Sequence, residues 1–235
     1  MNSIRKNIIA IAIAALVLLV GAPWLYINVI KDDAPSRLTL DTVVTTTPDT
    51  AVSPDTTSVA VPDGIIGTWT TGPESLAGYR VKEILVGQST EGVGRTSSVS
   101  GTLEIVDNSV TTAEFTVDMT TLKSDSSKRD SQFSGRIMDT ATFPTATFTL
   151  TAPIVLPENA TAGEKFSTTA TGDLTLHGTT VAVTIPIEAQ LTNGKIAVQG
   201  TINIVFADYG IPNPSIGPVK TEDNGDLELL LVFGR

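Results

Sequence analysis

Two runs of alternating apolar side chains around one turn, within residues 181–206, constrain the fold more than any other feature of the sequence. Successive side chains of a strand point to opposite faces, so a period of two gives each run one apolar face. Asn193 and Gly194, between the runs, readily adopt the positive φ angles of a type I′ turn. The segment is therefore predicted to be a long β-hairpin, whose apolar positions are Val181, Val183, Ile185, Ile187, Ala189 and Leu191, then Ile196, Val198, Gly200, Ile202, Ile204 and Phe206.

Strands of this length, roughly 35–40 Å each at about 3.3 Å per residue, must cover their apolar face with another apolar surface. Antiparallel sheets usually do so by curling into a closed barrel or by packing as a two-sheet sandwich. A small barrel fills its interior with its own side chains, whereas a slightly wider barrel can hold a ligand there. The hairpin thus predicts an all-β domain.

The composition excludes several classes of function. The formal net charge of −10 argues against a nucleic-acid partner, because phosphate binding needs clustered lysine and arginine. The chain has no cysteine, which excludes disulfides and thiolate metal sites. Aromatic residues make up only 5% of the chain, while Thr, Val and Gly are frequent, and this suits strands and turns better than helices.

The first 30 residues have the pattern of a membrane anchor. Residues 8–30 carry no charge, and as a helix they would span roughly 35 Å, enough to cross a bilayer. Arg5 and Lys6 precede this run, so the positive-inside rule places the N-terminus in the cytoplasm and the rest of the chain outside. The alternative is a signal peptide cleaved after Ala22, followed by secretion, although Pro23 is unfavourable for cleavage. We therefore expect a single-pass protein of the cell membrane.

Residues 31–63 are rich in Thr, Pro, Asp, Ser and Val and show no helical period. Six aspartates stand against two basic residues, and an acidic, proline-interrupted segment cannot bury enough apolar surface to offset the entropy of ordering. We predict a disordered stalk here and a folded domain over residues 64–235.

The folded domain shows several further alternating segments, of which residues 110–119, 146–150 and 226–233 are the clearest. Residues 87–94 are polar and glycine-rich, which predicts a loop or a mobile hairpin tip. The four-residue spacing of Arg129, Phe133 and Ile137 predicts one short helix. No strand–helix–strand crossover is visible, so about eight antiparallel strands in a closed barrel fit better than a parallel α/β fold.

Five short segments follow one another along this domain: Gly-Tyr-Arg-Val at 78–81, residues 118–130, Phe-Pro-Thr-Ala-Thr-Phe at 143–148, Gly-Asp-Leu-Thr-Leu-His-Gly at 172–178 and Ala-Asp-Tyr-Gly-Ile at 207–211. Together they resemble the YceI-like family of exported polyisoprenoid-binding proteins, over residues 67–235. The resemblance implies an eight-stranded, lipocalin-like antiparallel barrel with a long apolar tunnel that takes an isoprenoid chain.

The sequence departs from the family pattern in two places. Many members open with an Asp-x-x-His-Ser-type segment, where this chain has Pro-Glu-Ser-Leu-Ala-Gly at 73–78, so any role of that histidine is not carried over. The anchor and stalk are additions to a domain that is usually soluble and exported.

The inward-facing apolar residues are the candidate ligand contacts. Alternation alone fits both a solid core and a ligand tunnel, but small inward residues such as Ala113, Ala146, Ala189 and Gly200 leave room, and the resemblance favours a cavity. Arg80 and Arg129 are candidate contacts for a polar head group; for Arg129 the alternative is an ion pair with Asp130 that holds the helix. The predicted apolar contacts are Tyr79, Phe115, Met119, Phe133, Phe148, Ile185, Ile187, Ile204, Phe206 and Leu229.

Catalytic chemistry has little support in the sequence. His177 is the only histidine, no Gly-x-Ser-x-Gly motif is present, and a lone histidine cannot form a histidine-rich metal site. Its place before Gly178 predicts a turn residue. The spacing of Asp118, Asp125 and Asp130 does not follow a calcium loop. We expect no enzyme, no cofactor and no metal.

The function expected from the sequence is binding, storage or transport of an isoprenoid or other long-chain lipid inside the barrel, at the outer face of the membrane. The alternative is a structural or partner-binding module with a filled barrel and no ligand.

Overall fold

The predicted hairpin forms as β10 (Thr179–Thr192) and β11 (Lys195–Val205), paired in register from Ile187 opposite Gly200 to Thr192 opposite Lys195. Asn193 and Gly194 have φ angles of 51° and 72°, as the predicted turn requires. The computed structural model describes residues 34–41, 64–85, 87–161 and 163–235. The hairpin prediction is confirmed.

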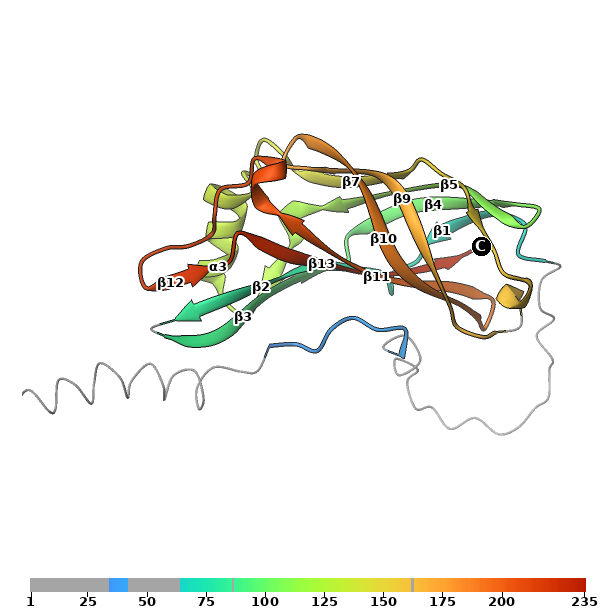
Figure 1. Ribbon diagram of the computed structural model, residues 1–235, viewed down its shortest axis with the longest axis horizontal. Helices are drawn as coiled ribbons and strands as arrows, with labels where there is room; N and C mark the ends of the chain where they lie inside the picture. The colour runs from blue at the N-terminus through green and yellow to red at the C-terminus, as the bar shows by residue number, and fades with distance from the viewer. Residues whose placement is uncertain (1–33, 42–63, 86, 162) are drawn as a thin grey trace, which may run out of the picture.

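Eight antiparallel strands, including the two strands of this hairpin, close into a barrel (Figure 1). The ring closes because the last strand pairs back with the first, with Thr70 opposite Gly234. The prediction of an eight-stranded antiparallel barrel is thus confirmed. In ring order the strands are β1 (Gly67–Thr71), β4 (Val99–Val106), β5 (Ser109–Asp118), β7 (Thr145–Leu150), β9 (Phe166–Leu176), β10, β11 and β13 (Asn224–Gly234).

A second hairpin, β2 (Leu76–Leu85) and β3 (Gln88–Thr96), extends the barrel wall at one end, because residues 226–230 of β13 pair with β2. Three short strands complete the sheet: β6 (Lys123–Ser124) beside β3, β8 (Ile154–Val155) beside β5 and β12 (Val219–Thr221) beside β2. The prediction of a loop or a mobile hairpin tip over residues 87–94 is wrong except at Gly87, where the hairpin turns, because residues 88–94 belong to β3. A Cβ added at Gly94 would lie 2.4 Å from the ring of Tyr79, so this glycine makes room for a side chain within a strand.

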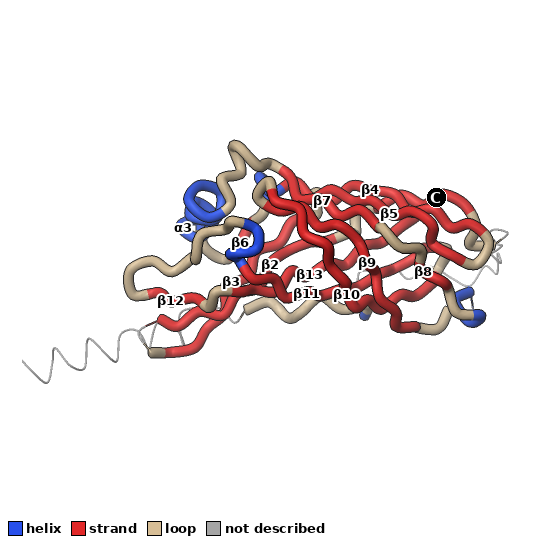
Figure 2. Tube along the Cα trace, turned by 45° about the horizontal axis from the view of Figure 1, so that its top comes forward, coloured by secondary structure: helices blue, strands red, loops and turns tan. Residues whose placement is uncertain are grey.

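The predicted short helix is present as α3 (Ser127–Gln132), which continues into a π-helical turn at Phe133–Ile137. The Ser126 side chain accepts a hydrogen bond from the Arg129 backbone N–H and so caps the helix. Figure 2 shows α3 at the same end of the barrel as β6 and β12. Single 3₁₀ turns lie at Met119–Thr121, Glu158–Thr161 and Phe206–Tyr209.

Residues 34–41, here called the strap, lie along the outer wall of the barrel (Figure 1). Leu38 and Leu40 are only 3% and 2% exposed, and they pack with Leu76, Ala197 and Leu230. The prediction of a disordered stalk over residues 31–63 is therefore wrong for these eight residues. The physical reason is that β13 has apolar side chains on its outward face too, and the strap covers part of that face. The other stalk residues lie outside the described ranges.

Charged side chains fill the rest of the contact between strap and wall. The Arg80 guanidinium donates to Glu228 at 2.6 Å and to Glu91 at 2.5 Å, and the side chains of Arg80 and Glu228 are 4% and 1% exposed. Arg95 and Arg37 also donate to Glu228, at 3.1 and 3.4 Å. Burial by itself would lower the pKa of Arg80, but the two carboxylates outweigh burial and raise it. We call these residues, with Asp226, the outer-wall ion cluster.

Asp226 is expected to make the stability of the barrel depend on pH in the acid range. Burial alone would raise the pKa of this carboxyl, but hydrogen bonds from Asn203 and Arg37 outweigh burial and lower the pKa. A carboxyl with a lowered folded pKa stabilises the fold above its unfolded pKa of about 3.9, and this contribution is lost as the pH falls further. Asp226→Asn should therefore lower the free energy of unfolding at neutral pH. Below about pH 4, the free energy of unfolding should fall less steeply with pH in this variant than in the wild type.

Urea unfolding of the full-length chain in detergent, repeated across the acid range, measures this effect. Asp173→Asn is the matched control, because Asp173 is exposed on β9. Wild type and Asp226→Asn should converge at the lowest pH, where both side chains are uncharged. Curves that stay parallel throughout would contradict the assignment.

No helix in the described part of the chain is long and apolar enough to cross a membrane. The predicted anchor over residues 8–30 lies outside the described ranges.

Candidate functional site

The barrel encloses a main cavity of about 520 Å³ at the end where α3 lies. Its walls are side chains of β2, β5, β7, β9, β11 and β13, closed on one side by α3 and the π-helical turn. The cavity opens at this end, since its lining includes the exposed residues Lys128, Ile216, Gly217 and Pro218; we call this opening the mouth. Sites for small organic ligands commonly have volumes of about 300–1,000 Å³. The main cavity is large enough to be such a site.

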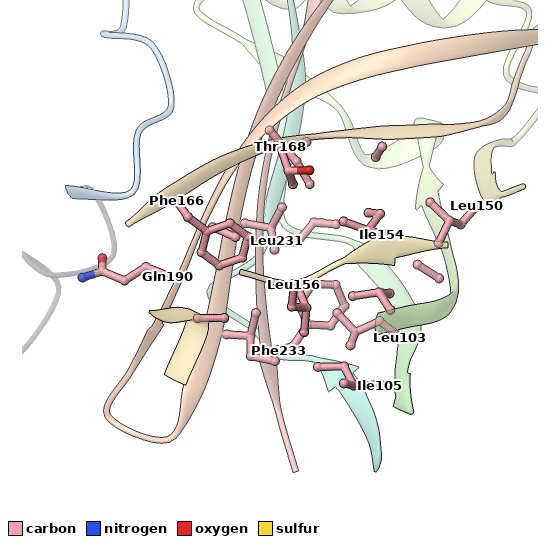
Figure 3. Close-up of a pocket in the computed structure, with 18 of the residues that line it drawn as sticks. Leu103, Ile105, Leu150, Ile154, Leu156, Phe166, Thr168, Gln190, Leu231 and Phe233 are labelled. Carbon is pink, nitrogen blue, oxygen red and sulfur yellow. The ribbon is translucent and has the colours of Figure 1, made fainter. Parts of the chain in front are cut away.

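A small cavity of about 100 Å³ lies at the opposite end of the barrel interior (Figure 3). Aliphatic and aromatic side chains such as Leu103, Leu156, Phe166 and Phe233 line it. Gln190, one of its few polar neighbours, turns its amide away from them and donates to the Gly163 carbonyl at 2.8 Å. This end of the barrel is therefore mostly filled by the protein's own side chains.

Phe115 and Leu229 line both cavities, and we call these two residues the partition. The Phe115 ring stacks on Phe148, with ring centroids 5.0 Å apart and an interplanar angle of 18°. A Cβ added at Gly172 would lie 2.5 Å from the Phe148 ring, so only glycine there allows this packing. The backbone thus makes room for an aromatic pair formed by facing residues of the neighbouring strands β5 and β7.

The structure places all ten predicted apolar contacts inside the barrel. Five line only the main cavity, three line only the small one, and the two partition residues line both. In that order they are Tyr79, Met119, Phe133, Ile204 and Phe206; Phe148, Ile185 and Ile187; Phe115 and Leu229. Their contact with a ligand stays a prediction.

Arg80 does not belong to this site. It lies between Tyr79 and Val81, which both line the main cavity, so its side chain points to the opposite face of β2. There it joins the outer-wall ion cluster, and the Pro35 carbonyl accepts a further hydrogen bond from it at 2.6 Å. The prediction of Arg80 as a head-group contact is wrong because alternation places it outside the lumen.

Arg129 lines the main cavity near the mouth, as predicted for a head-group contact. Its guanidinium donates to Glu83 at 3.2 Å and to Asp125. Burial alone would lower its pKa, but these carboxylates outweigh burial and raise it, so Arg129 stays charged. The alternative of an ion pair with Asp130 is wrong in its partner, since Asp130 instead accepts hydrogen bonds from Ser124.

Tyr79 lies close to this charged group. Its ring stacks on Phe133, with centroids 5.0 Å apart and an interplanar angle of 11°. Burial raises the pKa of the Tyr79 hydroxyl above its ordinary value, and the nearby Arg129 charge offsets only part of the rise. The hydroxyl therefore stays protonated. Chemically, the site combines a deep apolar volume with a cation and a phenol near its opening.

Sequence reasoning missed several residues that line the main cavity toward the mouth. Several come from the segment between the 3₁₀ turn at Phe206–Tyr209 and β12, where no alternation is visible. The one available signal was the concentration of apolar residues and prolines in a short stretch. These lining residues are Ile211, Pro214, Ile216, Pro218 and Val219.

His177 lies in the turn between β9 and β10, with a φ angle of 48°, and its ring packs against Phe143 with centroids 4.6 Å apart. The prediction of a turn residue is confirmed. Within the described ranges, no three acidic or histidine side chains come together as metal ligands.

A closed eight-stranded barrel with an apolar cavity open at one end places this protein in the class of lipocalin-like barrels. The YceI-like domain family matches residues 52–233, and the chain belongs to this family. Comparison with curated proteins found no match.

Two solved structures are similar to this chain. One is a polyisoprenoid binding domain from Saccharophagus degradans implicated in plant cell wall breakdown, with a TM-score of 0.56 and 17% identity, covering 72% of this chain and 98% of that one. The other is BcnA from Burkholderia cenocepacia, with a TM-score of 0.50 and 21% identity, covering 66% of this chain and 95% of that one. At these identities the likeness establishes the fold.

Proposed function

We propose that this protein binds an isoprenoid or another long-chain lipid in its barrel and retains or carries it without chemical turnover. The observation that carries the proposal is the main cavity of about 520 Å³, whose walls are mostly apolar, with charged and polar side chains such as Glu83, Lys128 and Arg129 among them. Burying an apolar chain there gains roughly 25 cal/mol per Å² of area removed from water, before the costs of binding. Arg129 and Tyr79 lie where a polar end group would meet the mouth. The similar Saccharophagus degradans domain is a polyisoprenoid binding domain, which supports the same ligand class.

The test is extraction of the purified full-length protein with organic solvent, followed by mass spectrometry of the extract. A stoichiometric apolar lipid that is absent from a mock purification would support the proposal. Protein that carries no lipid, and that takes up none from added isoprenoid alcohols, would instead favour the alternative of a module without a ligand.

We further propose that residues 8–30 anchor the barrel to the outer face of the cell membrane. The support is the length and apolarity of this run and the position of Arg5 and Lys6 before it. An anchored protein should resist an alkaline wash of membranes and keep its first residues on N-terminal sequencing. A new N-terminus near Pro23 would establish cleavage and secretion instead.

The partition is expected to limit the length of the bound chain. Phe115→Ala would remove the larger of the two partition side chains, so a longer ligand could reach past Leu229 into the small cavity. Each further buried methylene contributes about 0.8 kcal/mol. Two of them therefore favour the longer of two ligands by about tenfold. Competition between isoprenoid alcohols of graded length, read by mass spectrometry, measures the shift.

Phe133→Ala is the matched control for this prediction. This substitution also removes a phenyl ring, but from the wall of the main cavity and not from the partition, so the preferred ligand length should stay unchanged. Equal shifts in both variants would mean that the partition does not set the length.

A further inference from the structure

The strap begins toward the mouth end of the barrel and runs along the outer wall toward the opposite end. The Pro35 carbonyl accepts a hydrogen bond from Arg80, which lies opposite Asp226 in the sheet, near the start of β13 at the mouth end. At the other end of the strap, Asp41 forms an ion pair at 2.6 Å with Lys165, just before β9 and the small cavity. Figure 1 shows the same direction, with the strap running from beneath β2 and β3 along the barrel. The first residues of the strap therefore lie nearer to the mouth than its last residue does.

Several contacts fix the strap in this direction. The Ser36 carbonyl accepts a hydrogen bond from Arg95, and Arg37 donates to Asp226 at 2.7 Å. Leu38 and Leu40 are almost completely buried against the wall. A segment with two buried leucines and several charge-assisted hydrogen bonds does not act as a free tether.

The tether before the strap is short compared with the distance that the barrel extends beyond it. Only three residues lie between residue 30, where the apolar run ends, and Ala34, so they bridge at most about 14 Å. Leu85, the last residue of β2, lies five residues beyond Arg80, roughly 16 Å further along the strand. If the anchor ends at the membrane surface, Ala34 lies within about 14 Å of that surface, and a barrel that stands with its mouth toward the bilayer brings Leu85 into contact with it.

The residues at this end suit such a contact. Ile84 and Ile216 are 50% and 45% exposed at this end, and Leu85, Ile216 and Pro218 line the mouth. Exposure alone does not select this end, because Val155 at the opposite end is 71% exposed. The direction of the strap makes the choice.

We propose that the rim of the mouth, formed by Leu85, Ile216 and Pro218, docks on the lipid bilayer together with the neighbouring exposed Ile84, and that the strap holds it there. An isoprenoid would then pass between bilayer and cavity without crossing water. This inference rests on the proposed function, since it takes residues 8–30 as the anchor and a lipid as the ligand.

The absence of cysteine allows a direct test with single labels. Ile84→Cys, Ile216→Cys and Val155→Cys variants of the full-length chain are labelled with an environment-sensitive fluorophore and reconstituted into phosphatidylcholine vesicles. Lipids that carry a quencher in their acyl chains should quench the labels at residues 84 and 216 several-fold more than the label at residue 155. Equal quenching at the two ends, or stronger quenching at residue 155, would overturn the proposal.

A second arm tests the strap itself. Leu38→Asp places a charge in the buried contact and should release the strap, so that quenching at residue 216 falls while the protein still resists an alkaline wash. Ala182→Asp, on the exposed outer face of β10, is the control and should change neither readout. Unchanged quenching in Leu38→Asp would overturn the role of the strap.

Solvent extraction of the same samples separates this inference from the proposed function. Bound lipid with an unquenched rim would reject the docking and leave the binding function intact. A quenched rim without extractable lipid would support the docking and reject the lipid ligand. Protein that the alkaline wash removes would reject both the anchor and the docking that depends on it.

Discussion

Glu228→Gln is expected to lower the free energy of unfolding by about 3 kcal/mol, near the lower end of the range for breaking one partner of a buried ion pair. Glu228 accepts from Arg80, Arg95 and Arg37, and its side chain is almost fully buried. Glutamine keeps the shape and one acceptor oxygen but removes the charge. In the described part of the chain, Glu91 would then be the one carboxylate left in contact with the buried Arg80.

Urea unfolding of the full-length chain measures the change, and Glu188→Gln is the matched control. Glu188 is exposed on the outer face of β10, and substitutions at such positions usually stay within about 0.5 kcal/mol. Glu228→Leu combined with Arg80→Met should recover part of the loss, because an apolar pair leaves no uncompensated charge in that position. If the double variant loses more unfolding free energy than the Glu228→Leu and Arg80→Met single variants lose in sum, Arg80 and Glu228 do not stabilise each other.

The same cluster shows where sequence reasoning succeeds and where it stops. Alternation predicted the barrel, because every second residue of β10, β11 and β13 must face the lumen whatever the details of packing. It also contained the information that Arg80 points outward, since Tyr79 and Val81 flank it. A positive charge is compatible with a lipid head group, but the position in the alternating pattern decides which face of β2 the charge occupies.

Two local patterns in the sequence indicate the contact between strap and wall. Leu38 and Leu40 alternate within a polar segment, and Leu230 and Val232 add apolar side chains to the outward face of β13. Each pattern predicts a buried face, but neither identifies its partner, because the contact joins segments about 190 residues apart. Composition averaged over residues 31–63 concealed the eight residues that pack.

Whether the lumen is open could not be predicted from the pattern of apolar residues. All ten predicted contacts line a cavity, yet the space is divided into about 520 and 100 Å³. The division depends on the ring orientations of Phe115 and Phe148 and on Gly172, which makes room for one of them. Such packing is a property of the assembled barrel and has no periodic signature in the sequence.

Ala146→Phe is expected to reduce the lipid retained by the purified protein by at least about tenfold, equivalent to about 1.4 kcal/mol of binding free energy. Ala146 faces inward from β7 and lines only the main cavity, so a phenyl ring there would occupy space that the apolar chain needs. Adding a large side chain to a packed core usually costs about 1–3 kcal/mol of stability. Here the ring enters an existing cavity, so the cost should be smaller.

Ala182→Phe is the matched control, because Ala182 is exposed on the outer face of β10 and does not line either cavity. Extraction and mass spectrometry should recover as much lipid from this variant as from the wild type. Thermal unfolding of both variants, followed by circular dichroism, establishes that a loss of lipid does not come from a loss of fold. If folded Ala146→Phe retains its lipid in full, the ligand does not lie in the main cavity, and the proposed binding site is wrong.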